Sequence, residues 1–199
     1  MIIENDLLKA TNEEEINHID INKNSGIFEK LPIYIVAHYT ASGTLQQALN
    51  TFVDPDIKAS CHLIIDRDGA VVQLDDFSCI MWHAGKSKWK GKSNLNYYSI
   101  GIELVNWGYL RKSTTKPVYY TWTNNELIDT QVLNDNGTYW EEYTTIQIGK
   151  FIDVCQLLKR KYNINDLLGH NQISPKRKVD PGPAFPLNRI RTLLFEDRK

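Results

Sequence analysis

The chain has 199 residues, 42% of them hydrophobic and 24% charged, and its formal net charge is −1. This composition is typical of one globular domain, and a charge so close to zero argues against nucleic acid as a partner. No apolar run is long enough to span a membrane, and the acidic start "MIIENDLLKATNEEE" lacks the basic and apolar regions of a signal peptide. We therefore expect a protein made in the cytoplasm, without membrane insertion, and a monomer by default.

Hydrophobic periodicity predicts alternating strands and helices along most of the chain. Residues 1–31 are polar and are expected to form an N-terminal extension, in which "TNEE" (Thr11 to Glu14) is typical of a capping box over a short helix. The turn "DRDG" predicts a hairpin, because Gly69 can adopt a positive φ. The predicted elements are, in chain order, a strand at 32–40, a helix at 44–53, a hairpin at 61–74, a strand at 98–107, a helix within 141–162 and a helix at 186–195.

The stretch at about 108–143 is polar and aromatic, and it interrupts this pattern. We interpret it as an inserted hairpin and loop, which either walls a cleft or packs on itself. The remaining elements imply one α/β domain over residues 32–199, with a mixed central β-sheet flanked by helices.

Glu103 is the first candidate for chemistry. In the strand "YSIGIELVN" the side chains of Ile100, Ile102 and Leu104 share one face, whereas Gly101 and Glu103 share the other. A carboxylate in mid-strand needs either solvent or a partner. Glu103 therefore belongs either to the solvated face of an edge strand or to the floor of a cleft.

Two histidines and an aspartate offer a set of metal ligands. His38 ends one apolar run, His170 follows another, and Asp180 lies ten residues further along the chain in the proline-rich loop "SPKRKVDPGP". Two imidazoles and one carboxylate would leave a fourth tetrahedral position for water, as catalytic zinc requires. Each histidine alone is equally well explained as a structural residue, and spacing does not pair His38 with His170.

The dipeptide Cys61–His62 invites comparison with a cysteine nucleophile and its base. Adjacent residues of a strand point to opposite faces, so the two side chains cannot easily face each other. We therefore expect a structural role for His62. The three cysteines, Cys61, Cys79 and Cys155, are odd in number and widely spaced, and we expect free thiols.

Four blocks of sequence resemble a known family. They are "IVAHYTAS", "CHLIIDRDGAVVQL", "WHAGKSKWKGKSNLNYYSIGIELVN" and "GHNQISPKRKVDPGPAFP". In this order they closely resemble the zinc-dependent N-acetylmuramoyl-L-alanine amidases, a family that includes amidase-type phage lysozymes and is related to the peptidoglycan-recognition proteins. The resemblance covers roughly residues 32–107 and 145–195.

The resemblance implies a zinc ion held by His38, His170 and Asp180. It also implies that Glu103 is the catalytic carboxylate and that Lys178 stabilises charge on the substrate carbonyl. In one branch of the family a tyrosine occupies the place held here by Cys61, which makes Glu103 more necessary. The expected reaction is hydrolysis of the amide bond between N-acetylmuramic acid and L-alanine in peptidoglycan.

Residues of the block around "WHAG" are expected to line the substrate cleft. For His83 the alternatives are substrate contact and a packing role, and the same choice holds for Trp82, Trp89 and Asn94. We expect an endolysin-like enzyme that acts on the bacterial cell wall after release. The alternatives are a cytoplasmic muropeptide-recycling amidase and a module that binds muropeptides without cutting them.

Overall fold

A mixed sheet of six strands forms the centre of the protein in a computed structural model that describes residues 1–11, 16–128 and 130–196. Among the described strands, β6 and β7 pair antiparallel, while the other neighbours in this sheet are parallel. The predicted hairpin at 61–74 is thereby confirmed, and Gly69 in its turn has φ +88°. The strands, in their order across the sheet, are β17 (Asp166–Gly169), β5 (Tyr34–Tyr39), β11 (Ser99–Leu104), β6 (Leu63–Ile65), β7 (Val71–Gln73) and β3 (Ile16–His18).

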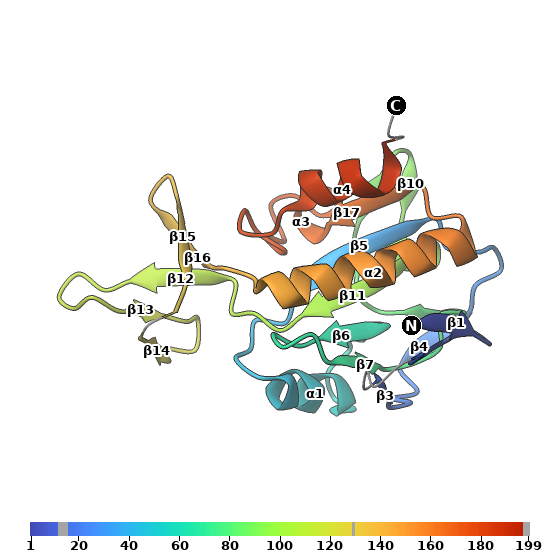
Figure 1. Cartoon of the computed structure of the whole chain (residues 1–199), viewed down its shortest axis with the longest axis horizontal. Helices are drawn as coiled ribbons and strands as arrows, with labels where there is room; N and C mark the ends of the chain where they lie inside the picture. Colours follow the sequence, from blue (N-terminus) through green and yellow to red (C-terminus); the bar gives the residue numbers. More distant parts are fainter. Residues whose placement is uncertain (12–15, 129, 197–199) are drawn as a thin grey trace.

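Helices cover the sheet, as the α/β prediction requires (Figure 1). Helix α2 (Thr145–Tyr162) and helix α4 (Leu187–Phe195) share the main apolar core with Ile100, Ile102 and Leu104 of β11. Helix α1 (Leu45–Val53) packs on a second core that includes Ile64 and Val72. The alternation predicted for β11 is therefore confirmed, and it leaves Gly101 and Glu103 on the opposite face from α2.

Local signals explain where α2 begins and ends. The Thr144 hydroxyl accepts a hydrogen bond from the backbone N–H of Gln147 at 3.0 Å, which caps the first turn. Asn163 ends the helix in the left-handed conformation, with φ 56°, after three basic residues in the last turn.

The N-terminal segment joins the same folded unit. Strand β1 (Ile2–Glu4) pairs with β2 (Leu7–Lys9), and β3 extends the central sheet by pairing with β7. Leu8 is fully buried in the main core. The short helix predicted from Thr11 falls on residues 12–15, which lie outside the described residues.

A second layer covers the sheet face that carries Glu103. It consists of short elements between residues 79 and 98, together with helix α3, and its apolar core includes Ala84, Leu95 and Ile173 packed on Val36. The elements of this layer are β8 (Cys79–Met81), which pairs with β4 (Asn24–Ile27), β9 (Lys88–Trp89), β10 (Lys92–Ser93), η1 (Leu95–Tyr98) and α3 (His170–Ile173).

The insertion is more regular than the predicted hairpin and loop. Its described residues form a separate antiparallel sheet of five strands, which projects from one end of the domain (Figure 1). The strands are β12 (Tyr109–Lys112), β13 (Tyr119–Tyr120), β14 (Glu126–Leu127), β15 (Val132–Asp135) and β16 (Thr138–Glu141). Within the part of the chain that the structure describes, no helix has the length and hydropathy needed to cross a bilayer.

Candidate metal centre

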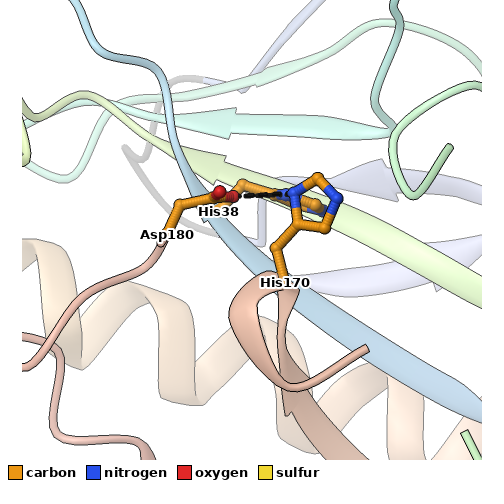
Figure 2. Close-up of side chains that lie close together, drawn as sticks. All are labelled: His38, His170 and Asp180. Carbon is orange, nitrogen blue, oxygen red and sulfur yellow. Dashed lines mark hydrogen bonds and ion pairs between the residues drawn. The ribbon is translucent and has the colours of Figure 1, made fainter. Parts of the chain in front are cut away.

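His38, His170 and Asp180 meet at one point of the structure (Figure 2). The His38 Nδ1 atom lies 2.9 Å from His170 Nδ1 and 2.9 Å from Asp180 Oδ2, and His170 Nδ1 lies 2.9 Å from the same carboxylate oxygen. All three residues are buried. The set that spacing alone did not pair is therefore a compact cluster.

The topology of the sheet explains this convergence. His38 lies near the carboxyl end of β5, and His170 directly follows β17, the parallel neighbour of β5. The carboxyl ends of parallel neighbours meet at the same edge of the sheet, so the two imidazoles meet although 132 residues separate them. The loop that follows α3 returns Asp180 to the same edge, where its carbonyl accepts the N–H of Asn171 at 2.8 Å.

The outer nitrogens of both imidazoles are held by hydrogen bonds to their surroundings. His170 Nε2 lies 3.2 Å from the carbonyl oxygen of Ala84, and His38 Nε2 lies 3.1 Å from His83 Nδ1. His83 Nε2 in turn lies 3.2 Å from the carbonyl oxygen of Ser99. Because a carbonyl only accepts, His83 donates from Nε2, and neutral His83 must accept the Nε2–H of His38. His170 Nε2 also lies 3.3 Å from an Arg177 guanidinium nitrogen, which itself donates to the Ala84 carbonyl.

These bonds leave lone pairs at the centre of the cluster. With its Nε2 proton donated outward, the neutral ring of His38 presents an unprotonated Nδ1 atom to Asp180 Oδ2 and to His170 Nδ1. The His38 lone pair and the carboxylate oxygen, 2.9 Å apart, repel each other unless a cation lies between them. Two imidazoles and a carboxylate form a donor set that suits zinc. The residues present therefore fit a divalent metal ion.

The pKa shifts of the cluster favour the metal-binding protonation states. Burial, reinforced by the adjacent His170, lowers the pKa of His38 from 6.5 to about 4, so the ring is neutral near pH 7. Burial alone would raise the pKa of Asp180, but the adjacent imidazoles of His170 and His38 hold it below its usual value. Near neutral pH the cluster thus offers a neutral imidazole at His38 and a carboxylate at Asp180.

Glu103 lies beside this cluster on the same face of the sheet. It pairs in register with His38, so the two side chains are neighbours on adjacent strands. Its Oε2 atom is buried and has no hydrogen-bond partner among the described residues. Burial, with a smaller contribution from the Asp180 carboxylate, raises the pKa of Glu103 to about 8, while Lys178 opposes the rise. The alternative of a solvated edge strand is wrong, because β11 lies between β5 and β6.

Lys178 lies close enough to influence both Glu103 and His38 electrostatically. It follows α3, and its backbone N–H donates to the carbonyl of Ser174 at 3.1 Å. The side chain is half-buried. The five residues singled out for metal binding and catalysis are thus brought together.

The four residues expected to contact substrate lie in different surroundings. His83 is 8% exposed, with both ring nitrogens bonded to His38 and Ser99. Trp82 donates its indole N–H to Ser25 at 2.7 Å, and Trp89 packs against the core under α3. Asn94 is exposed in a turn, with φ 58°. Substrate contact by these residues stays a prediction.

Two polar residues that the sequence analysis did not single out support the same region. Asn96 Oδ1 accepts the backbone N–H of Ala84 at 2.7 Å, and Arg177 donates to the Ala84 carbonyl at 2.8 Å and to Ser174 Oγ at 2.7 Å. No local pattern in the sequence marks either residue, since both act on backbone groups that only the folded chain brings near them.

The insertion contacts the loop that carries Asp180. A Cβ atom at Gly182 would lie 2.7 Å from the Trp140 ring, so β16 packs closely on this loop. Just beyond the insertion, the Tyr143 hydroxyl donates to the Pro181 carbonyl at 2.7 Å. The Trp122 indole N–H donates to the carbonyl of Ala41, three residues beyond His38, at 2.8 Å. The insertion therefore packs on itself and also against the segments that follow His38 and Asp180.

The chain is similar to known proteins along most of its length. A family model described as N-acetylmuramoyl-L-alanine amidase matches residues 29–183. The 1,6-anhydro-N-acetylmuramyl-L-alanine amidase AmpD of Enterobacter cloacae is 32% identical over 154 residues, which are 71% of this chain and 66% of that protein. The N-acetylmuramoyl-L-alanine amidase AmiD of Escherichia coli is 28% identical over 165 residues, 78% of this chain and 51% of that protein.

Solved structures with the same fold cover almost the whole chain. A crystal structure of an AmpD derivative superposes with a TM-score of 0.68 and 25% identity, covering 98% of this chain and 99% of that one. AmiD of E. coli, solved with anhydro-N-acetylmuramic acid-L-Ala-D-gamma-Glu-L-Lys, gives a TM-score of 0.63 and 25% identity over 95% of this chain and 64% of that one. The chain spans about two thirds or less of several curated relatives, such as 66% and 58% of the AmpD proteins of E. cloacae and Citrobacter freundii.

Proposed function

Because the chain belongs to the N-acetylmuramoyl-L-alanine amidase family, we propose that it hydrolyses the amide bond between N-acetylmuramic acid and L-alanine with a bound zinc ion. The observation that carries the proposal is the meeting of His38, His170 and Asp180 within 2.9 Å of one another, with a buried, unpartnered carboxylate oxygen of Glu103 beside them. This arrangement combines a three-ligand site with a proton acceptor.

Each residue has a defined task in this reaction. His38, His170 and Asp180 would hold the zinc ion, which supplies a Lewis acid and lowers the pKa of water at the site. Glu103 accepts a proton from the attacking water and delivers it to the L-alanine nitrogen as the amide bond breaks. The raised pKa of Glu103, about 8, suits a group that both takes up and releases a proton near neutral pH. Lys178 offsets the negative charge that grows on the amide oxygen.

Soluble muropeptides are the substrate class that the relatives favour. The AmpD proteins are named for 1,6-anhydro-N-acetylmuramyl-L-alanine, and the AmiD structure holds an anhydro-N-acetylmuramic acid peptide. The endolysin-like role expected from the sequence remains a prediction. Solved endolysin amidases share the fold at 18% to 20% identity, which supports the architecture alone.

The decisive experiment measures newly released L-alanine amino groups. Zinc-loaded protein is incubated with an anhydro-muramyl tripeptide and, in parallel, with whole peptidoglycan sacculi. Release that stops on chelation and returns with added zinc supports the proposal, and the preferred substrate separates a recycling enzyme from a lytic one. The matched control is Glu103→Gln, which keeps the side-chain size and removes the proton acceptor.

The alternative of a binding module leads to a different result in the same experiment. Such a protein would bind the muropeptide without releasing any L-alanine, and it would do so in the absence of zinc. Retention of both histidines and of Asp180 favours the enzyme. Zinc-loaded protein that binds the muropeptide but releases no L-alanine would refute the hydrolase.

A further inference from the structure

His83 is a hydrogen-bond partner of a proposed metal ligand, and the reaction described above gives it no task. Its ring is buried behind His38, and its Nδ1 atom lies 3.1 Å from His38 Nε2. The two rings meet edge to face, with centroids 5.2 Å apart and planes at 80°. This geometry directs the His83 lone pair at the edge of the His38 ring.

The position of the His83 ring is fixed from two further sides. Its Nε2–H donates to the Ser99 carbonyl at 3.2 Å. Its face lies against Gly101, where an added Cβ atom would be 2.3 Å from His83 Cγ. Strand β11 therefore fixes the ring in two ways. The Ser99 carbonyl accepts its hydrogen bond, and Gly101, which has no side chain, leaves the space in which the ring packs.

The bond to Ser99 determines which nitrogen of His38 is free. Since the carbonyl requires a proton on His83 Nε2, neutral His83 accepts at Nδ1 and His38 must carry its proton on Nε2. The His38 lone pair is then on Nδ1, the atom that faces His170 and Asp180. A backbone group of β11 thus sets the tautomer of a ligand on β5.

We propose that His83 is a positioning residue for the metal centre, which fixes the tautomer and the ring orientation of His38. The adjacent residue contacts the other imidazole, because the Ala84 carbonyl lies 3.2 Å from His170 Nε2. Two consecutive residues therefore contact the two histidines. Outer partners of this kind typically change metal affinity by about 10- to 100-fold when they are replaced. The inference rests on the proposed zinc site and is tested by metal binding, without reference to hydrolysis.

Two amide substitutions separate the two hydrogen bonds of His83. The amide of asparagine lies close to where Nδ1 of a histidine ring would be, so His83→Asn can keep an acceptor for His38. Glutamine reaches the place of Nε2, so His83→Gln can keep the bond to Ser99 but lacks the acceptor. The matched control is His62→Gln, because His62 is a fully buried histidine bonded to the Cys79 carbonyl and the Gly101 N–H. Its ring meets the His83 ring edge to face, with centroids 5.9 Å apart, so the control shows what looser packing around His83 does while the His83 acceptor is kept.

The measurements are zinc affinity by competition with a chelating indicator, the visible spectrum of the cobalt-substituted protein, and the melting temperature of the metal-free protein. His83→Gln is expected to weaken zinc binding by about 10- to 100-fold and to alter the cobalt spectrum. His83→Asn should stay within a few-fold of the parent, and His62→Gln should lower the melting temperature with little change in affinity. If His83→Gln does not fold, His83→Ala replaces it in the comparison with His83→Asn.

Two results would overturn the inference. One is a parent protein that binds zinc tightly while both His83 variants bind it equally well with an unchanged cobalt spectrum. The other is a loss of affinity in His62→Gln as large as that in His83→Gln, because a general loosening of the core would then explain both. A parent that binds no zinc would overturn the zinc site together with this inference.

Discussion

We expect the domain to lose stability in acid, because the His62 imidazole is buried in its neutral form. The imidazole is fully buried, with Nε2 donating to the Cys79 carbonyl at 2.9 Å and Nδ1 accepting the Gly101 N–H at 3.0 Å. Burial lowers its pKa from 6.5 to about 4. Protonation of Nδ1 would also break the bond to Gly101, so the folded protein resists taking up the proton.

The sign and size of the effect follow from linkage. Between pH 6.5 and 4 the unfolded chain binds a proton at His62 that the folded protein does not, so the free energy of unfolding falls as the pH falls. The stabilisation is fully present above pH 6.5. From the two pKa values we expect a loss of about 2 kcal/mol between pH 7 and pH 5, and of about 3 kcal/mol once the pH reaches 4.

Urea unfolding of the metal-free protein at several pH values measures this loss. Other buried groups titrate in the same range, His38 among them, so the informative quantity is the difference between the parent and His62→Gln. The variant should be less stable at pH 7, and its dependence on pH should be shallower by about 2 kcal/mol between pH 7 and 5. Replacement of the exposed His18 by glutamine controls for the loss of one imidazole. Parallel profiles for the parent and His62→Gln would refute the reasoning.

Three further substitutions test the centre itself. Glu103→Gln should lower kcat by about 10²- to 10⁴-fold while zinc affinity stays close to that of the parent, and an unchanged kcat would exclude Glu103 as the proton acceptor. Lys178→Met should cost about 10²- to 10³-fold in kcat, with a smaller change in KM, if the ammonium acts on charge that grows during the reaction. Gly101→Ala places a methyl group against the His83 ring, so it should destabilise the protein by about 1–3 kcal/mol in thermal unfolding and weaken zinc binding; equal affinity would show that the ring is free to move.

Local patterns were sufficient to predict most of the central domain. The alternation of Ile100, Ile102 and Leu104 predicted which face of β11 is buried under α2, and hence which face carries Glu103. Such a prediction succeeds because it depends on a period of two along a single strand. The insertion was harder, since its described strands β13 and β14 are two residues long and show no period at all.

The metal centre depended on information that no local pattern contains. His38 and His170 are separated by 132 residues, and only the pairing of β5 with β17 brings them together. Strand β17 is four residues long and fully buried, and no alternation distinguishes so short an apolar run from the end of a helix. The resemblance to a family supplied the pairing that periodicity could not.

Gly101 shows what a sequence can and cannot predict about close packing. The glycine indicates that another group packs close to β11, but the sequence does not identify that group. The alternation along β11 places Gly101 on the same strand face as Glu103, and a glycine leaves space beside its neighbours on that face. In the structure that space is filled by the His83 ring, which would collide with a Cβ atom at this position. A glycine in a strand indicates that another group packs closely there. Which group this is depends on how the layer at residues 79–98 packs on β11. The space beside Glu103 is therefore filled by the His83 ring, which is the partner of a proposed metal ligand.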